Sequence, residues 1–367
     1  MKPWLAILAA AILAAGVGLA LAGCTRTGRG PEAANAPTDR TAGDKQDPYD
    51  VLAEAIRSNQ PALESLAAET YLESDQPPPA GLLEPLADAR DPGVRAMAVT
   101  VLGTTRRSGL VPLFRQKLRD AAPVVRLAAA YSLALNGDPP QVNALGEGLA
   151  SQDLAARRYA AWLLGLKGDS SAVTMLKKKL DDPDAMLVLR VAEALFRLGS
   201  RDGLAQVRAL TEHDRHPIRR LAARLLGQMG TTADIPRLEK LCQSRFLDVK
   251  LAAIAAVARQ GDFKRIELLL DLLDSREPAT TDLNVRALAA WELAETGYTP
   301  AVEPLARLMA RGDPMERTAA AAAMIRIRSA RQPWRSRILA DRPAPAASDA
   351  AAPAPAARPG PLPQNRF

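Results

Sequence analysis

A glycine recurs every 31 residues through the middle of this 367-residue chain, and most of these glycines are followed by Asp, Ser or Thr. A glycine that ends one helix, followed by a residue that caps the next, is the usual punctuation between helices. A fixed period of this length indicates a repeat architecture, in which each unit stacks on its neighbour. The glycines at this period are Gly137, Gly168, Gly199, Gly230 and Gly261, and Gly297 follows after 36 residues.

Each period contains a basic residue eleven positions before most of these glycines, with an alanine three residues later and a large apolar residue seven residues later. This spacing places the apolar positions on one face of a helix. A second apolar segment precedes each of these helices, so each unit is predicted to be two antiparallel helices. The basic residues are Arg95, Arg126, Arg157, Arg219, Lys250, Arg286 and Arg317. The preceding helices are expected near 111–118, 142–149, 173–180, 204–210, 235–241, 266–273 and 302–308.

The pattern resembles the short bacterial form of HEAT repeats, similar to the repeats of phycobilin lyases, over residues 80–328. The matching segments are Asp-Pro-Gly-Val-Arg at 91–95, Val-Val-Arg-Leu-Ala-Ala-Ala at 124–130, Pro-Ile-Arg-Arg-Leu-Ala-Ala at 217–223 and Asn-Val-Arg-Ala-Leu-Ala-Ala at 284–290. The resemblance implies an all-α fold, an α-solenoid of about eight two-helix repeats with an N-terminal helical cap, flanked by disordered segments.

The same resemblance implies a ladder of Asp and Arg residues between repeats, with Asp91, Asp153, Asp282 and Asp313 four residues before the repeat arginines. Val188 stands where the fourth repeat should have its arginine, so we expect the ladder to be interrupted and the solenoid to bend there. Extra residues around 275–281 are expected to form a longer loop in the seventh repeat.

The N-terminus reads as an export signal. Lys2 precedes an unbroken apolar run, and Leu-Ala-Gly-Cys at 21–24 closes it. This ending resembles the bacterial lipobox, which implies a signal peptide over 1–24, cleavage before Cys24 and acylation of Cys24. Thr25 then implies sorting to the outer membrane, so the predicted location is the bacterial cell envelope. An uncleaved membrane-spanning anchor is the alternative.

Composition divides the rest of the chain. Residues 25–47 are rich in Gly, Pro, Thr and Asp and are expected to form a flexible tether. Residues 48–79 are expected to form the helical cap that a solenoid requires, and 80–330 the repeats. Residues 331–367 are rich in Pro, Ala and Arg and are expected to be a disordered tail.

The net charge of +7 is concentrated in that tail, which has six arginines against two aspartates. The repeats are close to neutral, so no nucleic-acid partner is expected. The tail leaves open a second possibility, the binding of an acidic polymer of the cell envelope.

The sequence offers little chemistry. We predict no catalytic residue, no cofactor and no metal site. His213 and His216 form an HxxH pair, but they straddle a turn before Pro217 and lack a third ligand. Cys242 lies on an apolar helix face and is expected to be buried and inert. The phycobilin lyase class is set aside because an exported lipoprotein is the wrong compartment for it.

A row of variable residues lies five positions after each repeat arginine, and aromatic residues concentrate in this row. We predict that the row lines a concave surface and that its large residues, with neighbouring arginines, anchor a protein partner. The alternative is that the aromatic rings pack over alanine-rich grooves between helices and are structural. The predicted partner-binding residues are Tyr131, Trp162, Arg158, Arg220, Arg224 and Trp291.

These observations favour a monomeric, lipid-anchored scaffold that binds an unidentified protein partner and catalyses no reaction. The alternatives are an accessory subunit or lyase-like enzyme of the HEAT type in the cell envelope, and the polymer binder described above.

Overall fold

The computed structural model describes residues 46–138, 142–275 and 284–329. Two units divide the chain, 1–330 and 331–367, and the second lies outside the described residues. So do Cys24, the signal segment 1–24, most of the tether and Asp282. The structure describes residue 275 of the predicted long loop, but 276–281 also lie outside the described residues.

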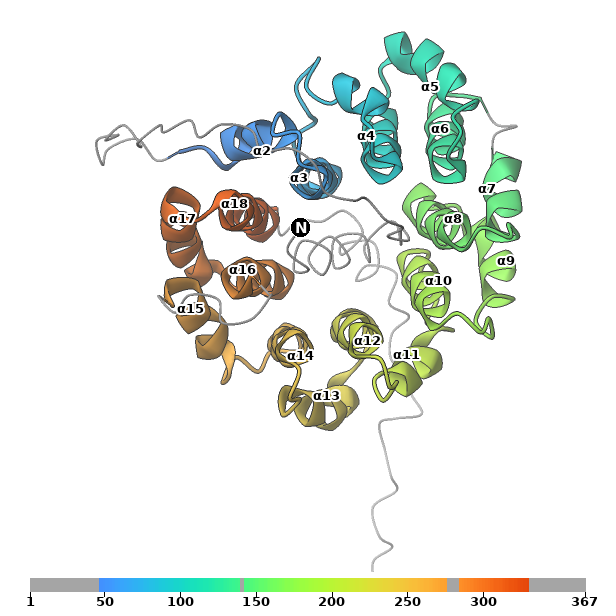
Figure 1. Ribbon diagram of the computed structural model, residues 1–367. Helices are drawn as coiled ribbons and strands as arrows, with labels where there is room; N and C mark the ends of the chain where they lie inside the picture. Colours follow the sequence, from blue (N-terminus) through green and yellow to red (C-terminus); the bar gives the residue numbers. More distant parts are fainter. Residues whose placement is uncertain (1–45, 139–141, 276–283, 330–367) are drawn as a thin grey trace, which may run out of the picture. The chain divides into compact units, whose positions relative to one another are not determined.

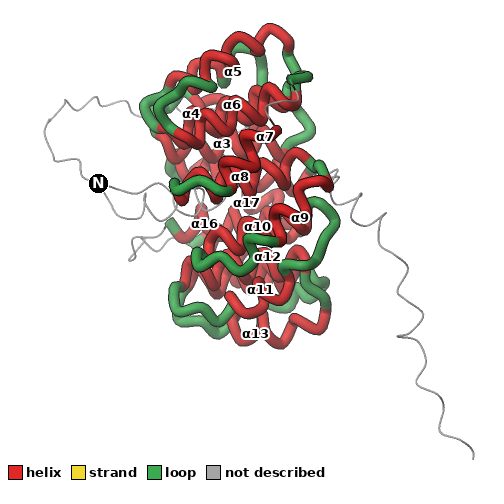
Figure 2. The backbone as a smooth tube through the Cα atoms, turned by 90° about the vertical axis from the view of Figure 1, so that its right-hand side faces the viewer, coloured by secondary structure: helices red, strands yellow, loops and turns green. Residues whose placement is uncertain are grey.

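Helices joined by short turns make up the described residues, and no strand occurs among them (Figure 2). This confirms the all-α prediction. None of these helices has the length and apolar character that a membrane span needs.

Two cap helices, α2 (Pro48–Ile56) and α3 (Pro61–Glu73), precede the repeats. The second helices of the repeats lie on the inside of the array (Figure 1). They are α4 (Pro92–Thr104), α6 (Pro123–Leu135), α8 (Leu154–Lys167), α10 (Ala185–Arg197), α12 (His216–Met229), α14 (Leu247–Arg259), α16 (Val285–Thr296) and α18 (Pro314–Arg328).

The first helices lie on the outside, one in front of each inner helix, as the apolar segments predicted. They are α5 (Val111–Lys117), α7 (Val142–Leu149), α9 (Val173–Lys177), α11 (Leu204–Leu210), α13 (Ile235–Cys242), α15 (Ile266–Asp274) and α17 (Val302–Arg311). Short 3₁₀ turns complete the set, η1 (Glu84–Asp88), η2 (Ser108–Leu110), η4 (Ser170–Ala172), η5 (Thr232–Asp234) and η6 (Thr299–Ala301).

Local signals set the helix boundaries. Asp91, Asp153 and Asp313 cap α4, α8 and α18 by accepting hydrogen bonds from backbone N–H groups of the first turn. At the other end, Gly168 and Gly297 end α8 and α16 in the left-handed conformation, with φ of 73° and 67°, which glycine adopts without strain.

The expected pairing of these aspartates with the repeat arginines is therefore wrong. Instead, the repeat arginines bind backbone carbonyls of the turn before their own helix. Arg126 Nη1 donates to the carbonyl oxygens of Asp120 and Ala121 at 2.8 and 2.9 Å. Arg157 and Arg219 make the same contacts one and three repeats later. The side chains of Asp91, Asp153 and Asp313 cap their helices and form no ion pair with an arginine of the described residues.

Side-chain bridges also join successive inner helices near their N-terminal ends, and there they occur at every second junction. They link α4 to α6, α8 to α10, α12 to α14 and α16 to α18. The bridges are Arg95–Asp120, Arg158–Asp184, His216–Asp248 and Arg286–Glu316, with donor–acceptor distances of 2.7 to 3.0 Å.

The same four pairs of helices are the most closely packed, and small residues explain why. Gly165 of α8 lies against Ala194 of α10, so that a Cβ built on Gly165 would stand only 2.7 Å from the Ala194 Cα. Gly227 meets Ala256 in the same way. Between α10 and α12 the equivalent residues are Phe196 and Leu225, and this junction is the loosest. The inner row is thus built from tightly joined pairs of repeats.

Gly165→Ala is expected to destabilise the protein by about 1–3 kcal/mol, because its new methyl group has backbone rather than a flexible side chain in front of it. The matched control is Gly146→Ala in α7, where the methyl group meets only the flexible end of Met175. That change should be neutral, or stabilising by up to about 1 kcal/mol from helix propensity. Chemical denaturation measures both, and equal effects would show that the close approach is unimportant.

The last inner helix returns to the first helices of the chain, so the array closes on itself (Figure 1). Helix α18 packs against α2 and α3. Arg317 of α18 pairs with Glu54 of α2 at 2.9 Å, and Arg326 of α18 lies 2.7 Å from Glu73 of α3. The described part of the first unit is therefore an α-solenoid of two-helix repeats, as predicted, but it closes into a ring in place of the long concave surface that we expected.

Candidate functional site

The ring is so tightly curved that inner helices two repeats apart touch one another. The Thr100 hydroxyl of α4 lies 2.7 Å from the Tyr159 hydroxyl of α8. Arg220 of α12 reaches Glu292 of α16 at 3.0 Å. Contacts of this kind cannot form in an open array, in which each repeat meets only its neighbours.

This curvature buries the row of aromatic residues. Tyr131, Trp162 and Trp291 are 2%, 4% and 6% exposed. Trp162 packs against the fully buried Tyr159, with ring centroids 5.3 Å apart. The expectation that these rings project from an exposed surface is wrong, because all three residues are buried.

The predicted arginines have separate places. Arg158 is bound by both oxygens of Asp184, at 2.7 and 2.8 Å, and so forms one of the bridges between repeats. Arg220 and Arg224 lie on α12 and point toward α16, where they join a group of charged side chains. The structure therefore brings together Arg220, Arg224 and Trp291, and it leaves Tyr131, Trp162 and Arg158 elsewhere.

We call this group the inner-face charge cluster. It is a set of charged residues, with one tryptophan, on the inner helices and on α3. Its members are Glu69, Glu73, Arg190, Glu193, Arg197, Arg220, Arg224, Arg259, Trp291, Glu292, Glu295 and Arg326.

Two ion pairs at the centre of the cluster span the width of α14. Arg220 Nε and Nη2 donate to Glu292 Oε1 at 3.2 and 3.0 Å, and Arg224 Nη2 donates to Glu295 Oε1 at 2.8 Å. Helix α14 carries the small Ala255 in the aromatic row, which leaves room for these side chains to pass in front of it. Arg259 at the end of α14 donates to Glu295 Oε2 at 3.0 Å.

Trp291 lies between two guanidinium groups. The Arg326 guanidinium carbon is 3.9 Å from the centroid of the Trp291 ring, and that of Arg224 is 5.6 Å from it. Both distances are in the range of cation–π interactions, which are stronger where water is excluded. Arg224 pairs with Glu295 and Arg326 pairs with Glu73. These contacts hold the guanidinium groups in place beside the Trp291 ring.

Several buried polar atoms of the cluster have no hydrogen-bond partner among the described residues. Such atoms are rare in folded proteins, and each one costs stability unless a ligand or water satisfies it. They include donors on Arg190, Arg224 and Trp291 and acceptors on two glutamates. The atoms are Arg190 Nη2, Arg224 Nε, Trp291 Nε1, Glu69 Oε2 and Glu292 Oε2, with Arg326 Nε and Nη1, which contact carboxylates at 2.7 and 3.7 Å without hydrogen-bond alignment.

Burial and charge separate the glutamates of the cluster. Although burial opposes it, the positive charges of Arg224, Arg259 and Arg326 hold the pKa of Glu295 well below its usual range. Burial raises the pKa of Glu292, which is 0% exposed, despite the nearby Arg220. Burial, with the adjacent Glu73, raises the pKa of Glu69 to about 7. The cluster therefore holds carboxyl groups with different affinities for protons.

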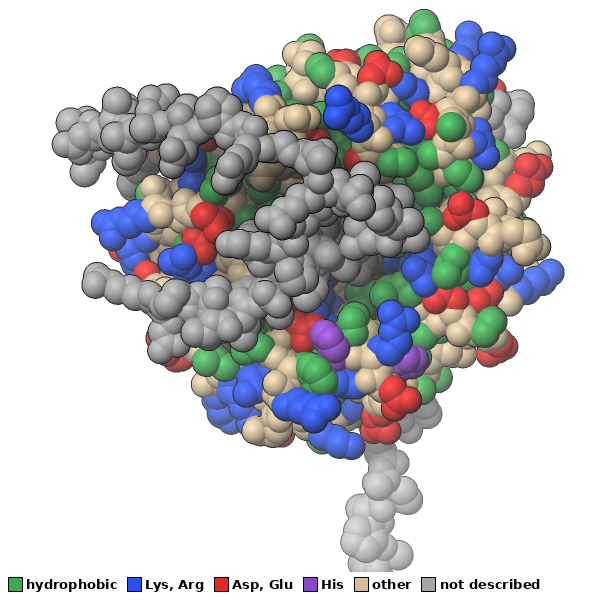
Figure 3. Space-filling model, viewed as in Figure 1, with side chains coloured by type: hydrophobic (Ala, Val, Ile, Leu, Met, Phe, Trp, Pro, Cys, Tyr) green, Lys and Arg blue, Asp and Glu red, His purple; other side chains and the backbone are tan. Residues whose placement is uncertain are grey.

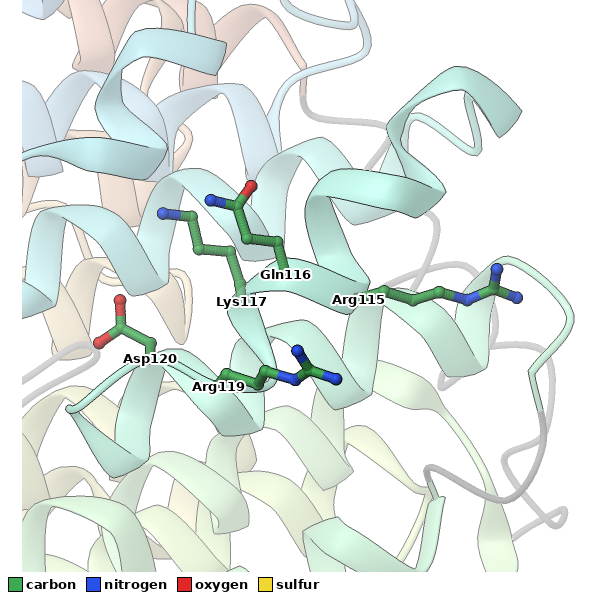
Figure 4. Close-up of a pocket in the computed structure, with 5 residues that line it drawn as sticks. All are labelled: Arg115, Gln116, Lys117, Arg119 and Asp120. Atoms are coloured by element: carbon green, nitrogen blue, oxygen red, sulfur yellow. The ribbon is translucent and has the colours of Figure 1, made fainter.

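A second candidate site is a hollow of about 520 Å³ on the outside of the ring, at the end of α5 (Figure 4). Two of its lining residues already form ion pairs. Lys117 lies 2.6 Å from Asp88, and Asp120 pairs with Arg95. Figure 4 shows Arg115 and Arg119 extending away from Asp120. No lining residue has an unsatisfied buried polar atom, so this hollow is a weaker candidate than the inner-face charge cluster.

The other candidates from the sequence, His216 and Cys242, have surroundings that are typical of structural residues. His216 Nδ1 lies 2.9 Å from a buried Asp248 oxygen, and no group of three or more metal-binding side chains occurs among the described residues. Cys242 is buried, and burial raises the pKa of its thiol to about 11, which disfavours the reactive thiolate.

Figure 3 shows acidic and basic side chains interspersed over one face of the ring, without one dominant patch.

Sequence inspection missed most of the cluster, although a signal was present. Nine positions after the basic position of each repeat, repeats four to eight carry a charged or amide residue, whereas the first three carry Thr or Leu. One helical turn separates this position from the aromatic row, so the two share a face. The residues are Arg197, Gln228, Arg259, Glu295 and Arg326.

Comparison with known proteins now places the fold. The family model of HEAT repeats matches residues 79–155 and 142–225. The chain contains HEAT repeats. The same pairing of an outer and an inner helix continues beyond the matched residues as far as α18. The helix pairs therefore run from η1 and α4 to the point where the ring closes.

Curated relatives of this HEAT-repeat array include the phycocyanobilin lyase subunit alpha of Picosynechococcus sp., 28% identical over 167 residues, which are 42% of this chain and 60% of that protein. The bilin biosynthesis protein PecE of Mastigocladus laminosus is 29% identical over 157 residues, 42% of this chain and 49% of that protein. The matches thus span only about half to three fifths of these relatives.

Solved structures with a similar arrangement include the complex of CpcE and CpcF of phycocyanin lyase from Nostoc sp. PCC7120, with 22% identity and a TM-score of 0.33, covering 70% of this chain and 94% of that one. Human deoxyhypusine hydroxylase has 17% identity and a TM-score of 0.32, covering 73% and 99%. TM-scores this low support no functional inference.

The relatives correct two predictions. They include an enzyme subunit and a biosynthesis protein, so the predicted non-catalytic scaffold is contradicted, and so is the prediction that the chain is no enzyme. Setting the phycobilin lyase class aside on compartment was also wrong. The repeat pattern describes how helices stack, and it does not distinguish a lyase subunit from a scaffold.

Proposed function

We propose that this protein is a lyase-type enzyme subunit, catalytic or accessory, that binds a bilin or a related linear tetrapyrrole at the inner-face charge cluster. The observation that carries the proposal is the similarity to bilin lyase and bilin biosynthesis proteins over the repeats that form the ring. The cluster supports it, because it is the place in the described residues where unsatisfied donors, acceptors and an aromatic ring converge.

The chemistry of such a ligand fits these groups. A bilin has a conjugated chain of pyrrole rings and propionate side chains. Guanidinium groups are suited to carboxylates, because their planar set of N–H donors matches the two oxygens. Arg190 and Arg224 each have an unsatisfied N–H donor in the cluster, and the pyrrole N–H groups would meet the free glutamate oxygens.

Arg224→Lys is expected to weaken binding of phycocyanobilin by at least about tenfold, because lysine keeps the charge but loses the guanidinium plane over Trp291 and its forked donors. The measurement is a titration followed by the absorbance of the bilin. Arg115→Lys, at an exposed position outside the cluster, is the matched control and should leave the dissociation constant unchanged. Circular dichroism checks that both variants are folded. Equal binding by both variants would reject the cluster as the site.

A protein partner is part of this proposal. The relative's name includes the word subunit, so we propose that a second chain completes the activity. Crosslinking in intact cells with mass-spectrometric identification tests this, and recovery of the chain without any crosslinked protein would count against it.

We also propose that the protein is lipid-anchored in a bacterial cell envelope through Cys24, at the outer membrane. The support is the order of Lys2, the apolar run and Leu-Ala-Gly-Cys at 21–24. Cys24→Ser is expected to release the protein into the soluble fraction without changing its thermal unfolding, because the acyl chains would be its anchor. Fractionation with metabolic labelling by a fatty-acid analogue measures both, and a Ser variant that stays bound after loss of the signal segment would refute the anchor.

A further inference from the structure

Glu69 of α3 differs from every other glutamate of the inner-face charge cluster. Glu73, Glu193, Glu292 and Glu295 each pair with at least one arginine. Glu69 forms no ion pair or hydrogen bond with the described residues, its Oε2 atom is buried without a partner among them, and the residue is only 4% exposed. A carboxyl group left in this state loses its hydration without compensation.

The position of Glu69 explains why it has no arginine. Arg326 of α18, at the closure of the ring, lies 2.7 Å from Glu73, one turn further along α3, and its guanidinium group lies over the Trp291 ring. The ion pair that closes the ring therefore leaves Glu69 without an arginine partner among the described residues, near the junction of α3 and α18.

Charges from several elements act on Glu69 from inside the ring. Glu73 on α3 raises its pKa, while Arg326 on α18, Arg190 on α10 and Arg224 on α12 lower it. Tyr159 on α8 and Arg197 on α10 also interact with it electrostatically. Since α10 and α12 lie across the ring from α3 (Figure 1), the carboxyl group is exposed to the field of the whole cluster.

We infer that Glu69 is the acid/base group of the inner-face charge cluster and transfers a proton to an unsaturated ligand bound there. This inference rests on the proposed function. A group that serves this purpose must be buried beside the ligand, free of a permanent ion pair and able to change its protonation state near neutral pH. Glu69 meets these conditions, and the paired glutamates do not.

The step that we assign to Glu69 is the protonation of carbon in an addition across a carbon–carbon double bond. The thiolate of a thiol co-substrate forms a C–S bond to one carbon as the π bond breaks, and the electron pair left on the other carbon takes the proton from Glu69 Oε2. Glu69 becomes a carboxylate, which the neighbouring arginines stabilise, and regains its proton from water. No electron is gained or lost overall, so no oxidant or reductant is required.

The test uses the full chain with phycocyanobilin and 2-mercaptoethanol as the thiol, and it compares Glu69→Gln with a matched control, Glu64→Gln. Glu64 lies on the same helix and is also buried. Its pKa is raised by burial and, to a smaller extent, by Asp91, which lies outside the cluster. In wild type, the rate of bilin addition should fall as the pH rises through about 7, because the acid form of Glu69 donates the proton. Glu69→Gln should bind the bilin within about twofold of wild type but react at least about a hundredfold more slowly and lose the pH dependence near 7. Glu64→Gln should keep both.

The outcomes separate the two proposals. If wild type binds and converts the bilin and Glu69→Gln keeps the rate and its pH dependence, the assignment of Glu69 is wrong and the proposed function stands. If wild type does not bind the bilin, both fail. In D₂O, deuterium at the protonated carbon of the product is an independent readout, and its retention at the wild-type rate in Glu69→Gln would also overturn the assignment.

Discussion

Trp162→Ala is expected to lower the free energy of unfolding by about 3–5 kcal/mol, the usual cost of emptying a buried aromatic site. Trp162 is buried against Tyr159, whose hydroxyl group contacts Thr100 two repeats earlier. The cavity would therefore open beside the contact between α8 and α4, and the close packing of the protein interior allows little collapse to fill it.

Chemical denaturation measures this effect, and Phe263→Ala is the matched control. Phe263 is an aromatic residue that is 41% exposed and touches only the edge of the array, at Tyr298. Its loss should cost less than about 1 kcal/mol. If Trp162→Ala were as mild as Phe263→Ala, the tight packing of the inner helices would be refuted and the exposed row would have to be reconsidered.

Arg220→Ala is expected to cost about 3–5 kcal/mol at neutral pH, because it leaves the Glu292 carboxylate buried without its counter-charge. Both N–H donors of Arg220 point at a single oxygen of Glu292, which is fully buried. The cost should shrink as the pH falls, since the pKa of Glu292 is already raised by burial and the protonated carboxyl group needs no counter-charge.

The control is Arg237→Ala, which breaks a pair of the same chemistry on the surface. Arg237 lies 3.1 Å from Glu212, but both side chains are exposed, so the loss should be at most about 1 kcal/mol. The double variant Arg220→Leu with Glu292→Leu should recover much of the stability, because an apolar pair leaves no buried charge. Denaturation at several pH values measures all three, and a pH-independent loss in Arg220→Ala would contradict the ionised state of Glu292.

Two results join the fold to the proposed activity. The closure of the ring brings α3 and α18 together, and this places Glu69, Arg326 and Trp291 near one another although they are distant in sequence. The curvature then brings α12 within reach of α16. A chain of the same repeats that did not close would present these groups on separate surfaces, where each would be solvated and none would have an unusual affinity for protons.

The sequence by itself determined the local architecture. A glycine near the end of each inner helix, aspartate caps and a fixed apolar period are short-range signals, so the helix pairs, their order and the all-α fold follow from them. The resemblance to HEAT repeats also followed, because the match is carried by residues such as Val125, Arg126 and Ala129 whose spacing is set within one helix.

Only the tertiary structure decided how the repeats are arranged as a whole. The rotation between neighbours is small and depends on packing details such as Gly165 against Ala194 or Phe196 beside Leu225, and these rotations add up over the array. Whether the array closes is a property of that sum, and no single repeat encodes it. The burial of Trp162, the isolation of Glu69 and the inner-face charge cluster all depend on closure, which is why the residues alone suggested an exposed binding surface.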